Sequence, residues 1–125
     1  MEKQIINTQD APKAIGPYAQ GILASGFIFT SGQLPLEPDS GKLVIGIKPA
    51  TDQVIKNVAA ILQEAGSSLS NVVKATVYLK SMDDFAAMNE VYTEHFGQNP
   101  PARTCFEVAK LPMDACVEIE VIALK

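Results

Sequence analysis

The chain has 125 residues, of which 47% are hydrophobic and 19% charged, and its formal net charge at pH 7 is −4. These values are typical of one domain with its own hydrophobic core, so we expect a single domain over residues 1–125. The lysines are scattered singly, which argues against a nucleic-acid partner because phosphate binding requires a clustered basic surface. No apolar run is long enough to span a membrane and the N-terminus lacks a signal-peptide pattern, so we expect a cytoplasmic protein without a membrane partner.

Three short strands and a helix are predicted in the first half of the chain. The strands are expected at residues 4–7, 18–23 and 27–31, where apolar and β-branched residues lie between glycine and proline turn signals. A loop over residues 34–48 follows. Apolar residues then recur at helical spacing over residues 50–65, and Gly66 is placed to end that helix.

The second half of the chain predicts a strand at residues 71–80, a second helix, and two more strands. Ser81 resembles a helix cap, and Gly97 stops the second helix. One strand lies between Pro100 and Pro112 and the last covers residues 116–124. The order is therefore β-β-β-α-β-α-β-β, which is typical of an α/β fold with two helices on one face of a single mixed sheet.

The two faces of the predicted sheet differ in composition. One face is apolar enough to be covered by the helices: Val73, Ala75, Val77, Leu79, Val117, Ile119, Val121 and Ala123. The other face mixes polar and apolar side chains: Thr76, Tyr78, Ile122, Leu124, Arg103, Cys105, Glu118 and Glu120. Because an uncovered, half-apolar sheet face commonly marks association, we expect this face to be buried between subunits of a homo-oligomer.

Arg103 is the only arginine of the chain and lies in the proline-bounded strand. Its planar guanidinium can bind a carboxylate through two parallel hydrogen bonds, which lysine cannot do. The residues allow two interpretations: an internal salt bridge to Glu107 or another acid, or an anchor for an anionic ligand. Glu118 and Glu120 are then either charge partners of the arginine or candidates to position a hydrolytic water.

The other residue types that carry chemistry form no recognisable pattern. His95 is the only histidine and falls in the second helix, at a surface or half-buried position. Neither Cys105 nor Cys116 has a partner at zinc-ligand spacing, so we expect no metal site and two free thiols. Gly32 permits close approach of a ligand or another chain, or else makes only a bulge or turn.

Five segments of the chain, in order, resemble motifs of one known family. They are Ala14-Ile15-Gly16-Pro17-Tyr18, Thr30-Ser31-Gly32-Gln33, Asn89-Glu90-Val91-Tyr92, Pro101-Ala102-Arg103-Thr104-Cys105 and Val117-Glu118-Ile119-Glu120. Together they resemble the Rid family, the YjgF-type group of reactive-intermediate imine deaminases, and within it the RidA type. The resemblance extends from the first loop to the last strand.

This resemblance implies a chorismate-mutase-like α/β fold in a homotrimer, with a central β-barrel, outer helices and ligand sites between subunits. It implies hydrolysis of 2-iminobutanoate and 2-iminopropanoate to 2-ketoacids and ammonia without a cofactor. A second reading is a non-catalytic module that senses small acids such as 2-ketoacids and regulates a partner protein. The nuclease and translation-inhibitor roles attached to some members fit this acidic chain poorly.

The resemblance also implies roles for individual residues. Arg103 would bind the substrate carboxylate, and Glu118 would orient the water that attacks the imine carbon. The backbone near Cys105 and Gly32 would donate further hydrogen bonds to the substrate. Three other residues would line the pocket or its edge: Tyr18, Ser31 and Asn89.

Overall fold

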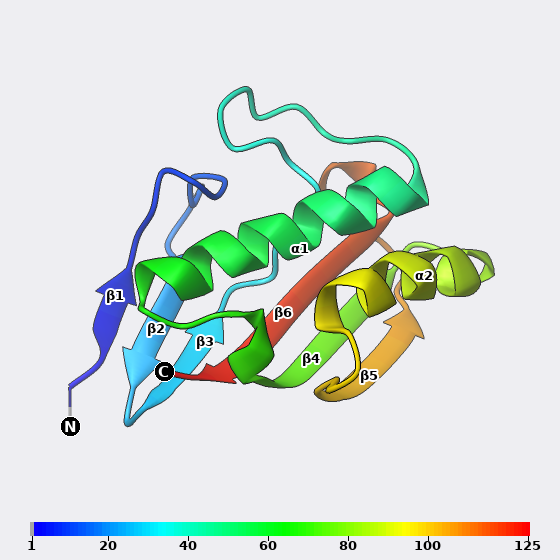
Figure 1. The fold of residues 1–125 in the computed structure, drawn as a ribbon. Coiled ribbons are helices and arrows are strands. Elements are labelled where there is room, and N and C mark those ends of the chain that lie inside the picture. The colour runs from blue at the N-terminus through cyan, green and yellow to red at the C-terminus, as the bar shows by residue number, and fades with distance from the viewer. Residues whose placement is uncertain (1) are drawn as a thin grey trace.

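Within residues 2–125, which the computed structural model describes, six strands form one mixed sheet with two α-helices packed on one face (Figure 1). The strands are β1 Gln4–Ile6, β2 Gly21–Ala24, β3 Phe27–Thr30, β4 Val72–Leu79, β5 Ala102–Glu107 and β6 Val117–Leu124. The helices are α1 Ile47–Glu64 and α2 Phe85–Phe96, and short 3₁₀ turns cover Leu69–Asn71, Met82–Asp84 and Pro112–Asp114. The predicted class and element order are confirmed.

The strands lie in the order β1-β2-β3-β6-β4-β5. All neighbours are antiparallel except β4 and β5, which are parallel and are connected through α2. The last strand, β6, therefore lies in the middle of the sheet, between the N-terminal hairpin and the β4–β5 pair (Figure 1). No helix within residues 2–125 is long and apolar enough to cross a membrane.

Local sequence explains where the main elements begin and end. Ser25 and Gly26 both have positive φ, 52° and 81°, as the tight hairpin between β2 and β3 requires. At the C-terminus of α1, Gly66 donates to the carbonyl of Gln63 and Ser67 donates to that of Leu62, which is a Schellman motif. The glycine stop predicted for the first helix is confirmed.

The hydrophobic core lies between the helices and one face of β4 and β6. Ala75, Val77 and Leu79 on β4 are fully buried, as is every second residue of β6 from Val117 to Ala123. The start of β4 departs from the predicted alternation. Val73 is 40% exposed, whereas Val72 is only 6% exposed. A bulge explains this, because the register against β6 shifts between Val72 and Lys74 and moves the side chain between them to the outer face.

The prediction that Arg103 and Cys105 share a face with Glu118 is wrong. Because β5 pairs with β4, Arg103 lies opposite Ala75 and Cys105 lies opposite Val77, on the face that the helices cover. Glu118 lies opposite Tyr78, on the other face. Alternation within each strand was predicted correctly, but the relative phase of the two strands depends on a register that alternation alone does not define.

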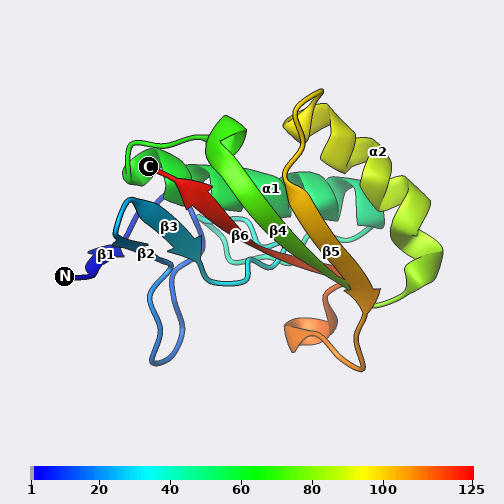
Figure 2. The same cartoon turned by 90° about the horizontal axis from the view of Figure 1, so that it is seen from below.

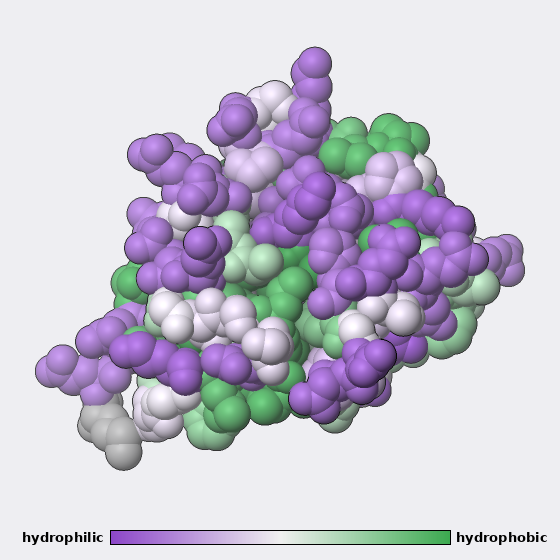
Figure 3. Space-filling model, viewed as in Figure 1, coloured by the Kyte–Doolittle hydropathy of each residue, from purple (hydrophilic) through white to green (hydrophobic). Residues whose placement is uncertain are grey.

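The face opposite the helices is called the open face below. It carries partly exposed large apolar side chains from β3, β5 and β6: Phe27, Phe29, Phe106 and Leu124. Figure 2 shows both helices on one side of the sheet and the loops near residues 7–20 and 108–116 projecting away from them. The helix-bearing side is covered mainly by hydrophilic residues (Figure 3).

Candidate functional site: two half-sites on one chain

Four of the predicted site residues line one cavity of about 700 Å³, which we call the Glu118 cavity. They are Tyr18, Ser31, Gly32 and Glu118. Tyr18 comes from the loop between β1 and β2, Ser31 and Gly32 follow β3, and Glu118 lies near the start of β6. The sheet thus brings together residues that are up to a hundred positions apart in the sequence.

Gly32 makes room for the Glu118 carboxylate. Gln33 and Ile119 exchange two backbone hydrogen bonds, of 2.8 and 3.2 Å, which hold the chain after β3 alongside β6. A Cβ atom on Gly32 would lie 2.0 Å from Oε2 of Glu118. Glycine at position 32 is therefore needed for the close approach of a carboxylate of the same chain, while approach of a ligand or of another chain stays a prediction.

Glu118 presents a carboxylate that no donor in the described part of the chain satisfies, since none of the hydrogen bonds or ion pairs found among residues 2–125 involves it. Burial raises the pKa of Glu118, and the nearby charge of Glu120 raises it further. A carboxylate with a raised pKa is a stronger base than an ordinary surface glutamate. Glu118 is thus suited to accept a proton from a water molecule in the cavity.

Glu120 is occupied, in contrast to its neighbour. Its Oε1 accepts a hydrogen bond from the hydroxyl of Tyr78. This bond is the main reason why the pKa of Tyr78 is raised to about 12, with burial contributing next. Glu120 therefore has a protein partner within its own chain, which supports its assignment as a structural glutamate.

The loop that carries Tyr18 is held by a buried glutamine that the sequence did not indicate. The amide of Gln20 donates to the carbonyls of Thr8, Ala11 and Pro12 and accepts from the N–H of Thr8. The strand β2 begins at Gly21 rather than at residue 18 as predicted, and Tyr18 belongs to the loop before it. The hydroxyl of Tyr18 accepts from the N–H of Ile15 at 3.2 Å, which orients the ring.

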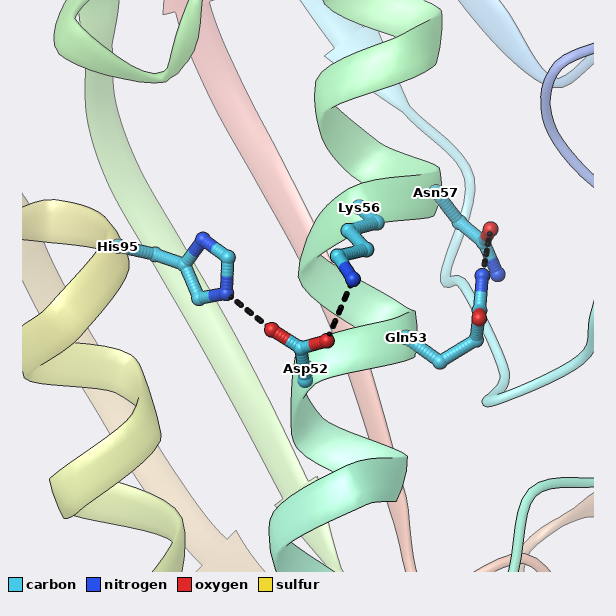
Figure 4. A network of polar contacts seen from close by, with 5 residues as sticks. All are labelled: Asp52, Gln53, Lys56, Asn57 and His95. Carbon is cyan, nitrogen blue, oxygen red and sulfur yellow. Dashed lines mark hydrogen bonds and ion pairs between the residues drawn. The ribbon is translucent and has the colours of Figure 1, made fainter.

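A second buried amide holds another wall of the Glu118 cavity. Asn57 of α1 is fully buried and donates to the carbonyls of Leu34 and Leu36, at 3.1 and 2.9 Å. Gln53 donates to its side-chain oxygen, as Figure 4 shows. In the sequence Asn57 looks like a solvent-facing helix residue, so nothing in the pattern could have identified it.

Figure 4 also shows the environment of His95. Its Nε2 lies 2.7 Å from Oδ1 of Asp52, whose other oxygen pairs with Lys56. The hydrogen bond with Lys56 is the largest of the effects that lower the pKa of Asp52. His95 is half-buried, as predicted, and links α2 to α1 rather than joining either half-site.

Arg103 forms the second half-site, together with Asn89. Its Nη1 donates to Oδ1 of Asn89 at 2.7 Å. The guanidinium lies 4.7 Å from the ring centre of Tyr92 and 5.5 Å from that of Phe85, in cation–π contact with both. Among residues 2–125 no carboxylate lies within ion-pair distance of Arg103, so the alternative of an internal salt bridge is not supported.

The remaining donors of Arg103 are available to a ligand. Arg103 and Asn89 line a cavity of about 400 Å³ beside the prolines at residues 100 and 101, which we call the Arg103 cavity. A guanidinium carries five N–H donors, and only one is used by the hydrogen bond to Asn89. Stacking on aromatic rings fixes the plane of the remaining fork, which favours bidentate carboxylate binding.

Cys105 packs its side chain against the hydrophobic core. Burial raises the pKa of its thiol, with a smaller opposing effect from Arg103. A thiol held in its protonated form is a poor nucleophile. Its strand, β5, is at the edge of the sheet, so alternate backbone groups point away from β4 and can bind a ligand. These observations favour a backbone contribution of Cys105 over a role of its thiol as a nucleophile.

The two half-sites lie on opposite faces of the sheet. The Arg103 cavity opens beside α2, and the Glu118 cavity opens between the loops on the other side. Among residues 2–125, the guanidinium of Arg103 and the carboxylate of Glu118 thus have no partner of opposite charge and lie on opposite faces of the sheet.

The fold and the two cavities define a small α/β protein in which an arginine and a glutamate line separate cavities on opposite faces of one sheet. The chain belongs to the Rid (YjgF) family, whose family model, described as endoribonuclease L-PSP, matches residues 8–125. A RutC family protein of Pyrococcus abyssi is 55% identical over 126 residues, with 100% of this chain and 99% of that protein covered.

Two other relatives have more informative names. Reactive Intermediate Deaminase A, chloroplastic, of Arabidopsis thaliana is 43% identical over 124 residues, which cover 98% of this chain and 66% of that protein. A protein of Lactococcus lactis named as a candidate regulator, AldR, is 47% identical over 121 residues, with 96% of each chain covered.

Solved structures agree with the fold throughout its length. A Thermotoga maritima protein, described as a candidate endoribonuclease, has a TM-score of 0.96 at 47% identity and covers 100% of this chain and 98% of its own. E. coli TdcF with bound serine has a TM-score of 0.94 at 42% identity, with 98% of both chains covered.

Proposed function

We propose that the protein is a cytoplasmic, cofactor-free enzyme that hydrolyses 2-imino acids such as 2-iminobutanoate and 2-iminopropanoate to 2-ketoacids and ammonia. The observation that carries this proposal is the pair of unpaired, complementary groups, Arg103 and Glu118, each facing a cavity. A relative named Reactive Intermediate Deaminase A supports the activity. TdcF with bound serine supports a pocket for a small α-amino or α-imino acid.

In the proposed reaction the Arg103 fork holds the substrate carboxylate by two hydrogen bonds. Glu118 accepts a proton from a water molecule as the water oxygen bonds to C2 of the protonated imine. The resulting carbinolamine takes the proton back on nitrogen, the C–N bond breaks and ammonia leaves. The hydroxyl proton passes to the released ammonia as the ketone forms, so the net products are the 2-ketoacid and ammonium. A protonated imine is already electrophilic, so correct placement of the water is the main task of the protein.

We further propose a homotrimer in which the open faces form a central barrel and each site joins the Arg103 cavity of one copy to the Glu118 cavity of its neighbour. Exposed aromatic side chains on the open face support association, because solvated sheet faces are usually more polar. The separation of the two half-sites also supports association, because a reaction that uses both Arg103 and Glu118 needs two copies of the chain. Light scattering should show an oligomer at micromolar concentration, and a monomer with full activity would contradict the proposal.

The activity is tested with threonine dehydratase as the source of 2-iminobutanoate. Wild-type protein should accelerate loss of the imine, and Arg103→Ala should abolish this acceleration while the protein stays folded. An Arg103→Ala protein with wild-type activity would show that the anchor is elsewhere.

A sensing module that binds 2-ketoacids and regulates a partner is the second candidate, and the relative named as a candidate regulator favours it. Arg103 is needed in both cases, whereas Glu118 distinguishes them. If the protein is an enzyme, Glu118→Gln should remove turnover and leave binding of 2-ketobutyrate largely intact. If wild-type protein binds 2-ketobutyrate but hydrolyses no imine, the sensing function is favoured.

A further inference from the structure

The Glu118 cavity as a whole is larger than the smallest proposed substrates require. Its volume of about 700 Å³ falls within the range of roughly 300–1,000 Å³ that accommodates drug-sized ligands. Beyond the carboxylate, its walls are mainly apolar: Ile15, Leu34, Leu36, Pro112 and Met113. Such a surface is suited to an aliphatic group longer than the methyl or ethyl group of the smallest 2-imino acids.

Met113 is the unusual member of this wall. It lies in the loop between β5 and β6 with φ 58° and ψ 19°, in the left-handed region. Asp114 follows with φ 56°. Aspartate tolerates this conformation, but a methionine rarely adopts it because its Cβ crowds the backbone. Met113 is also 58% exposed, so burial in the core does not explain the residue at this position.

The loop that contains Met113 and Asp114 is held by contacts with Lys80, which directly follows β4. Both carboxylate oxygens of Asp114 lie 3.0 Å from Nζ of Lys80, at the end of β4. The backbone N–H of Lys80 also donates to the carbonyl of Cys116, at 3.0 Å. These contacts fix the backbone that directs Met113 to the cavity, and strain maintained in this way is concentrated at ligand-binding positions.

The wall formed by Leu34 and Leu36 is rigid by comparison, because the buried amide of Asn57 binds both of their carbonyls. Methionine has three flexible side-chain bonds and a polarizable sulfur, so it adapts to aliphatic groups of different shape. The cavity thus combines a fixed wall with an adaptable one.

We propose that Met113 is a specificity-determining residue that favours 2-imino acids with longer aliphatic side chains, such as the one derived from leucine, over 2-iminopropanoate. The inference rests on the proposed imine hydrolysis and adds its substrate class. The thioether would contact the substrate side chain, while Arg103 and Glu118 act on the common part of the molecule.

The test compares imines generated from L-leucine and from L-alanine by an amino acid oxidase, with catalase present, and measures kcat/KM for each. Met113→Asn keeps a residue that tolerates positive φ and removes the apolar side chain. It should lower kcat/KM for the leucine-derived imine about tenfold, since a lost hydrophobic contact in a pocket has an effect of roughly 10–200-fold. The value for the alanine-derived imine should change by less than about twofold.

Met82→Asn is the matched control, because Met82 is another half-exposed methionine and does not line the cavity. It should leave the ratio of the two kcat/KM values unchanged. Thermal unfolding of both variants should be cooperative, which confirms that each is folded. Ile15 also lines the cavity, so Ile15→Asn should lower the ratio of the two kcat/KM values in the same direction as Met113→Asn.

The outcomes separate the two proposals. Wild-type protein inactive on both imines would overturn the proposed function and the specificity role with it. Active wild-type protein that prefers the alanine-derived imine, or whose preference survives Met113→Asn, would overturn the specificity role alone.

Discussion

Gly32→Ala is the substitution whose effect follows most directly from the geometry. The added Cβ would lie 2.0 Å from Oε2, 2.8 Å from Cδ and 3.1 Å from Cγ of Glu118. Non-bonded heavy atoms settle at roughly 3.5 Å, so the carboxylate oxygen must retreat by about 1.5 Å. A misplacement of about 1 Å at a reacting group can lower the rate roughly 100-fold. We therefore expect kcat/KM for 2-iminobutanoate to fall by about two orders of magnitude.

The fold should tolerate this change. The backbone of Gly32 is outside the left-handed region and the displaced group is the end of a flexible side chain, so stability should change by less than about 1 kcal/mol. A double-mutant cycle with Glu118→Gln tests the mechanism, because two changes that act through one carboxylate are not additive. The Gly32→Ala/Glu118→Gln protein should be no less active than Glu118→Gln. Wild-type activity in folded Gly32→Ala would refute the assigned role of Glu118.

Four further predictions concern the two half-sites and the buried amide of Asn57. Arg103→Lys should lower kcat/KM at least about tenfold in the coupled assay, because an ammonium cannot replace two parallel hydrogen bonds. Since burial raises the pKa of Glu118, kcat/KM of the wild-type protein should fall as pH decreases through a value above 4.5. A carboxyl whose pKa is raised by folding destabilises the folded state once ionised, so Glu118→Gln should raise the Tm at pH 7 and not below pH 4.5. Asn57→Ala should cost about 1–3 kcal/mol in urea unfolding, because it leaves the buried carbonyls of Leu34 and Leu36 without their donor.

The periodicity of apolar residues, together with the glycines and prolines at the ends of elements, was sufficient to predict the fold class and the order of the elements. Apolar periodicity identified α1 and α2, Gly66 and Gly97 marked their ends, and the proline-bounded strand was found at the correct place. The bulge at Val73 was not predictable, because it depends on how β4 pairs with β6 rather than on the composition of either strand. The same limit explains the wrong face assigned to Arg103 and Cys105.

Residue types in the sequence indicated which side chains belong to the candidate site. The sequence did not show which of these side chains lie close together in the fold. The single arginine was singled out on chemical grounds, and the structure shows it without a carboxylate partner among the described residues. Gln20 and Asn57 were missed because a buried amide and an exposed one look alike in sequence. Their role depends on carbonyls of distant loops that only the folded chain brings near.

The central claim is that each site takes Arg103 from one copy and Glu118 from another. It is tested most directly by mixing two inactive variants, Arg103→Ala and Glu118→Gln, under conditions that allow subunits to exchange. In randomly mixed oligomers at equal amounts, about a quarter of the sites combine the intact arginine with the intact glutamate. We expect activity to return to about a quarter of the wild-type value after exchange. Confirmed formation of mixed oligomers with no activity above that of the separate variants would contradict the account.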